Sequence, residues 1–75
     1  MKVLIKKNPD DRGEEIEAKA IKPRKVGVNQ WRTVVVPYSG DEVIVGPICK
    51  SATGAMSYIR ANETEAGGFV FHVDK

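Results

Sequence analysis

The chain has 75 residues, of which 41% are hydrophobic and 29% are charged, and its formal net charge is +2. This composition excludes an intrinsically disordered chain, which combines low hydrophobicity with high net charge. The length excludes several domains, so residues 1–75 are predicted to form a single domain. The single cysteine, Cys49, excludes an intrachain disulfide, and no apolar run is long enough for a membrane span or a signal peptide. We therefore expect a cytoplasmic protein.

The first third of the chain predicts two strands joined by a turn. Residues 2–7 alternate, with Val3 and Ile5 on one side, and residues 8–13 are rich in Asn, Pro, Asp and Gly, which favour turns. Residues 14–22 fit either a helix, from their Glu, Ala and Lys content, or a strand, from their alternation. We favour the strand because short isolated helices are marginal. Pro23 is expected to end it.

The rest of the chain predicts a hairpin, a helix and a last strand. Residues 30–38 and 42–48 are rich in β-formers and flank a Ser-Gly-Asp turn, which predicts an antiparallel pair. Apolar residues recur with a helical period in residues 50–63, where Ser51 or Thr53 can cap the helix. Residues 69–74 alternate again, with Phe69, Phe71 and Val73 facing inward. The predicted inner face of the helix consists of Ala52, Ala55, Met56 and Ile59.

These elements predict an α+β fold with the order β-β-β-β-α-β. We expect a small, antiparallel-dominated sheet of about five strands with one helix packed on one face.

Motifs for catalysis or cofactor binding do not stand out. One histidine and one cysteine exclude zinc sites built from several such residues. Residues 46–54 contain a Lys-Ser pair before the helix but lack the glycine that a phosphate-binding loop has before its lysine. The acids of residues 10–17 do not follow the spacing of a calcium-binding loop. We therefore expect no cofactor, no metal and no enzyme activity.

Charge is distributed unevenly along the chain. Residues 10–17 hold five of the ten acids, whereas residues 18–40 hold none. Residues 22–32 are expected to form a basic loop between two strands, and Trp, Tyr and Arg are the residues most often found at interface hot spots. The predicted contact residues are Lys22, Arg24, Lys25, Trp31, Arg32 and Tyr38.

Three interpretations of this stretch stay open. It can bind a protein, it can bind nucleic acid by phosphate contacts and stacking of Trp31, or Trp31 can belong to the core with the cations as ordinary surface. The acidic turn can also fold back and neutralise the basic stretch.

We favour a non-enzymatic protein-binding module. In size and general character the chain is similar to phage or mobile-element proteins that inhibit a host protein or nucleoprotein complex by occupying its surface. Nucleic-acid binding is the alternative. No membrane partner is expected, and homodimerisation through an unpaired strand edge is left open.

Overall fold

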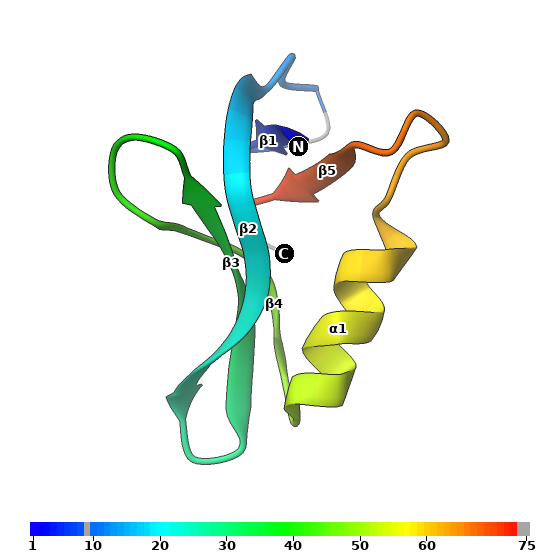
Figure 1. Cartoon of the computed structure of the whole chain (residues 1–75). Helices are drawn as coiled ribbons and strands as arrows, with labels where there is room; N and C mark the ends of the chain where they lie inside the picture. The colour runs from blue at the N-terminus through cyan, green and yellow to red at the C-terminus, as the bar shows by residue number, and fades with distance from the viewer. Residues whose placement is uncertain (9, 74–75) are drawn as a thin grey trace.

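The computed structural model describes residues 1–8 and 10–73. Within them the chain forms five strands and one helix in the predicted order β-β-β-β-α-β (Figure 1). Pro9 in the predicted turn and Asp74 at the predicted end of the last strand lie outside these residues. The elements are β1 (Lys2–Lys6), β2 (Glu14–Gly27), β3 (Gln30–Pro37), β4 (Val43–Cys49), α1 (Ala52–Ala61) and β5 (Phe69–His72).

The five strands form one mixed sheet in the order β4-β3-β2-β1-β5. All neighbours are antiparallel except β1 and β5, which are parallel because the chain crosses over through α1 between β4 and β5. The long strand β2 serves both parts of the sheet: residues 14–17 pair with β1, and residues 18–27 pair with β3. An irregular register at Lys19 separates the two parts, and such bulges bend a strand.

Pro23 does not end β2, contrary to the prediction. The strand continues through it, with Pro23 opposite Thr33 of β3. Since β1 pairs only with residues 14–17, no described strand lies on the other side of β2 at Pro23. A proline on such an open edge removes no ladder hydrogen bond. The connection to β3 therefore shrinks to Val28 and Asn29, and Asn29 takes a left-handed φ of 53°, which asparagine tolerates.

Helix α1 packs on one face of the sheet, as predicted (Figure 1). Ser51 is its cap, because its hydroxyl accepts from the backbone N–H of Gly54 at 3.1 Å; Thr53 lies inside the helix. Ala55 and Ile59 are buried, but Met56 is 37% exposed, and Tyr58 packs on the core in its place. The buried core cluster consists of Val3, Ile5, Ala18, Val35, Val45, Ile59 and Phe71.

The inward alternation of the last strand is confirmed. Phe71 is fully buried, and Phe69 packs beside it with 5.7 Å between the ring centroids. Tyr58 of α1 stacks on Phe71 at the same centroid distance. Within residues 1–8 and 10–73, no helix has the length and the apolar character needed to cross a membrane.

Candidate functional site

The predicted contact residues are divided between the two faces of the β2–β3 hairpin. Lys25 lies opposite Trp31, and Trp31 lies opposite Cys49, whose side chain contacts the start of α1. Lys25 and Trp31 therefore belong to the helix side of the sheet. Lys22 and Arg24 alternate with Pro23 and share the opposite face. The hairpin thus presents its cations on both sides.

Arg32 is bound to the backbone of β4 and of the residue that follows β5. Its Nε and Nη2 donate to the carbonyl oxygen of Gly46 at 3.1 and 2.5 Å, and Nη2 also donates to the carbonyl of Val73 at 3.2 Å. Gly46 belongs to β4, and Val73 follows β5. β4 and β5 are the two edge strands of the sheet, and they contact each other because the sheet curls. Arg32 therefore joins the two edges of the curled sheet.

Arg24 forms an ion pair with Glu42, at the start of β4. The pair crosses β3 on the face that carries Val34, because Val34 lies opposite Lys22 and Arg24 follows Lys22 on the same face. Val34 is fully buried. The hydrogen bond from Arg24 holds the pKa of Glu42 below its ordinary value of 4.5, and the charges of Arg24 and Lys22 act in the same direction.

We expect Arg24→Gln to return the pKa of Glu42 to its ordinary range, as measured by NMR titration of the Glu42 carboxyl. Because the folded-state pKa is depressed, the stabilisation from this pair is full above pH 4.5 and is lost as the pH falls through the folded-state pKa. Lys22→Gln is the matched control and should move the pKa less, since Lys22 acts only through its charge. An unchanged pKa in Arg24→Gln would contradict the assigned cause.

The two predicted aromatic contacts lie far apart. Trp31 is half-buried near the turn, at the beginning of β3. Tyr38 follows the other end of β3 and is 69% exposed. The structure therefore does not bring Trp31 and Tyr38 together.

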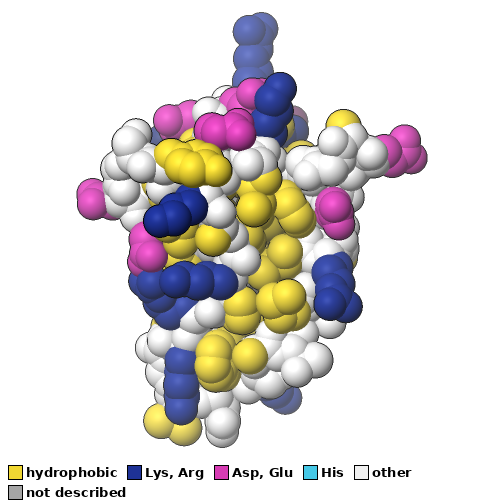
Figure 2. Space-filling model, viewed as in Figure 1, with side chains coloured by type: hydrophobic (Ala, Val, Ile, Leu, Met, Phe, Trp, Pro, Cys, Tyr) yellow, Lys and Arg dark blue, Asp and Glu magenta, His cyan; other side chains and the backbone are white. Residues whose placement is uncertain are grey.

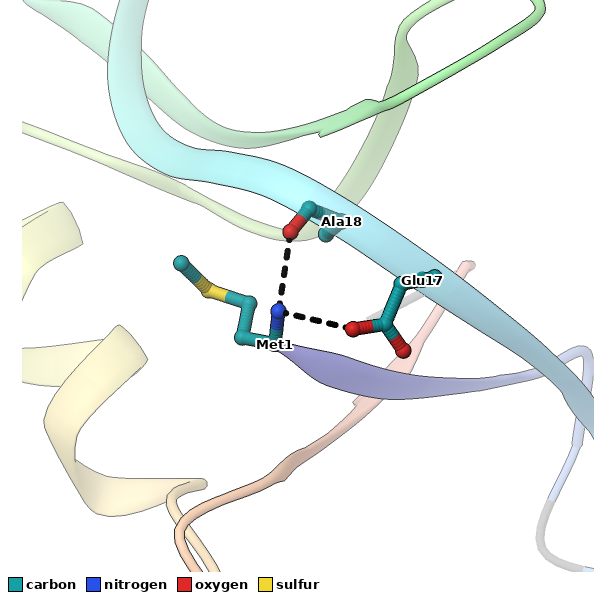
Figure 3. A network of polar contacts seen from close by, with 3 residues as sticks. All are labelled: Met1, Glu17 and Ala18. Atoms are coloured by element: carbon teal, nitrogen blue, oxygen red, sulfur yellow. Dashed lines mark hydrogen bonds and ion pairs between the residues drawn. The ribbon is translucent and has the colours of Figure 1, made fainter.

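The acidic segment does not pair with the basic hairpin among the described residues. Glu17 instead accepts from the amino group of Met1 at 3.2 Å, and the same amino group donates to the carbonyl of Ala18 at 3.0 Å (Figure 3). The Asp11 carboxylate accepts from the backbone N–H of Lys7, and this bond lowers the pKa of Asp11. The acids thus stay at the β1 end of β2, and the charges remain separated along the strand.

A second acid-free segment extends the basic region. Residues 43–62 contain no Asp or Glu, like residues 18–40, and the sheet places the two segments side by side because β3 lies between β2 and β4. In Figure 2 the side chains at the bottom of the view, around the β2–β3 turn, include Lys and Arg but no Asp or Glu. Seven cations belong to these segments: Lys19, Lys22, Arg24, Lys25, Arg32, Lys50 and Arg60.

Apolar side chains are exposed at the same end of the sheet. Val28, in the turn, is 85% exposed, and Val26 beside it is 42% exposed. Ile48 is 61% exposed and precedes Cys49, which lies opposite Trp31 next to the turn. Sequence reasoning missed these three residues, although a valine in a turn is itself an unusual choice. We call this end of the sheet, with both of its faces, the hairpin end; it comprises Lys22, Lys25, Val26, Val28, Ile48 and Lys50.

The described residues contain no group of three His, Cys, Asp or Glu side chains that could hold a metal ion. Cys49 lies at the end of β4, with its sulfur 3.8 Å from the carbonyl oxygen of Pro47. Comparison with protein families, with curated proteins and with solved structures finds no match. The case for a function therefore depends on the geometry of the hairpin end.

Proposed function

We propose that the protein is a non-enzymatic binding module that docks on an acidic surface of another protein through the hairpin end. The observation that carries this proposal is the exposed Val28 at the tip of a hairpin, within a half of the molecule whose charges are all positive apart from Glu42 at its border.

Local structure gives no reason for a valine at this tip. Turn positions favour Gly, Asn, Asp and Ser, which supply unusual backbone angles or bond to the backbone. Val28 does neither, and Asn29 provides the left-handed residue. An exposed β-branched side chain at a tip instead supplies apolar contact area to a partner. Val26 and Ile48 add exposed apolar area at the same end of the sheet, and apolar side chains are enriched at the centre of interfaces.

The lysines at the hairpin end indicate that the complementary surface of the partner is acidic. Lys22, Lys25 and Lys50 are exposed, and none of them forms an ion pair within the described part of the chain. Such cations accelerate association with an acidic surface and select against basic ones. Arg24 and Arg32 are engaged within the fold, so we assign them to stability rather than to the contact.

Nucleic acid is the second candidate, supported by the same cations. Single-strand binding by stacking needs an exposed aromatic ring on the basic surface. Trp31 is half-buried, and the exposed Tyr38 lies at the other end of β3. The exposed apolar side chains of the hairpin end are aliphatic and not aromatic, which favours a protein partner. A chain of this size can inhibit a larger host complex by occupying its surface, and this inhibition is part of the proposal. The single cysteine supports a cytoplasmic location.

The test is affinity capture from a lysate of the cell in which the protein occurs. We expect the Lys22/Lys25/Lys50 triple alanine variant to lose a partner that the wild type retains after nuclease treatment. The matched control removes three exposed cations from the β1 end, as Lys2/Lys7/Arg12 to alanine, and should retain the partner. Material that disappears on nuclease treatment would make the protein a nucleic-acid binder, and equal loss in both variants would overturn the assignment of the hairpin end.

A further inference from the structure

A partly apolar hollow lies at the opposite end of β2 from the hairpin turn. It forms where β3 leaves β2: the backbone N–H of Tyr38 still donates to the carbonyl of Glu17 at 3.4 Å, after which residues 38–42 turn away. The hollow has a volume of about 450 Å³. Its lining includes Ile16, Tyr38, Val43, Glu14, Glu15 and Asp41.

The acidic hollow, as we call it, and the hairpin end are complementary in charge. Glu14, Glu15 and Asp41 are exposed, and no Lys or Arg is among the residues that line the hollow. The hairpin end carries Lys22, Lys25 and Lys50 and no acid. The apolar parts also correspond, because Val28 projects from a narrow turn while Ile16, Tyr38 and Val43 offer an apolar lining of the hollow.

These two surfaces cannot meet within one molecule. The acidic hollow adjoins residues 14–17, at the beginning of β2, and the turn follows Gly27 at its end, in a molecule whose longest Cα dimension is 32 Å. We propose that the hairpin end of one copy docks into the acidic hollow of a second copy, head to tail. This inference rests on the proposed function, since it names one protein partner for the hairpin end.

Head-to-tail contact leaves one hairpin end and one acidic hollow unoccupied at the two ends of every assembly. Such a contact adds further copies instead of closing as a symmetric dimer does. The mean mass should therefore rise steadily with protein concentration. The charged part of the contact should weaken with salt, because screening shortens the reach of exposed charges. Self-association would also cover the hairpin end and compete with any other partner.

Sedimentation velocity of the purified protein, from micromolar to millimolar concentration and at low and high salt, tests this. We expect the hairpin variant (Lys22, Lys25 and Lys50 to Glu) and the hollow variant (Glu14, Glu15 and Asp41 to Lys) to remain monomeric when each is alone. Mixed together they should associate again, since each surface of one then faces an opposite charge on the other.

A third variant controls for net charge. Changing Lys2, Lys7 and Arg12 to Glu alters the net charge as much as the hairpin variant does, but at the other end of the molecule. Alone it should self-associate as the wild type does, because its hairpin end and its acidic hollow are unchanged, whereas the hairpin variant of the same net charge stays monomeric. A third variant that stays as monomeric as the hairpin variant, or a wild type that stays monomeric at every concentration, would overturn the inference. If the wild type is monomeric but still captures another protein, the proposed function stands and only the docking of two copies is overturned.

Discussion

Replacing Arg32 by alanine is expected to lower the free energy of unfolding by about 2–3 kcal/mol, since hydrogen bonds to charged groups contribute about 1.5–3 kcal/mol each and their effects are not additive. The guanidinium donates to Gly46 and Val73 and so joins β4 to the chain after β5. Its removal leaves both carbonyl oxygens without this donor and frees the two edges of the curled sheet.

Thermal unfolding measured by circular dichroism checks this. A loss of this size lowers the melting temperature of a domain of this length by roughly 10–20 °C. Arg12→Ala is the control of the same residue type, because Arg12 is exposed in the β1–β2 turn, and it should change stability by no more than about 0.5 kcal/mol. If Arg32→Ala has the same melting temperature as Arg12→Ala, Arg32 does not hold the sheet edges together.

Gly46→Ala is expected to be still more damaging, with a loss of about 2–5 kcal/mol. Gly46 has a φ of +78°, which costs other residues about 1–2 kcal/mol. A Cβ added there would also lie 2.8 Å from Cζ of Tyr58, and overpacking of this kind costs typically about 1–3 kcal/mol. Tyr58 also stacks on Phe71, so a shift of its ring away from β4 would disturb that contact.

A substitution at Gly40 distinguishes the cost of the positive φ from the cost of the overlap with Tyr58. Its φ is +93°, but a Cβ there meets nothing within 4 Å, so Gly40→Ala should show the backbone cost alone. Chemical denaturation of both variants, and of Gly46→Ala in a Tyr58→Ala background, measures the remaining contact cost as a coupling energy. Equal losses at Gly40 and Gly46 would show that Tyr58 does not press on β4.

Local pattern was sufficient for most of the fold. The alternation of Val3 with Ile5 and of Phe69 with Phe71 identified buried faces, and Ser51 was one of two candidate caps. The prediction that Pro23 ends the strand was wrong. A proline fits inside β2 only where β1 no longer pairs with it, and no local sequence pattern shows where that pairing stops. The same holds for the helix face: its exact rotation decides that Tyr58, rather than Met56, reaches the core.

The candidate site was less accessible to sequence reasoning. Arg32 looks like any exposed cation until β4 and β5 are known to meet, because its acceptors are backbone carbonyls 14 and 41 residues away. The acid-free segment 43–62 is visible in the sequence, but it joins residues 18–40 only when β3 lies between β2 and β4. Val28 is the one signal that the sequence offered directly, as a valine at a turn.

The central claim is that the apolar tip of the hairpin end contacts a partner protein. The most direct measurement compares nuclease-treated capture by Val28→Asp and by Ala66→Asp, after circular dichroism has shown that both variants fold like the wild type. Both residues are exposed, and Ala66 lies between α1 and β5, outside the hairpin end and the acidic hollow. The account predicts that Val28→Asp loses the captured protein while Ala66→Asp retains it. Full retention of the captured protein by Val28→Asp would contradict it.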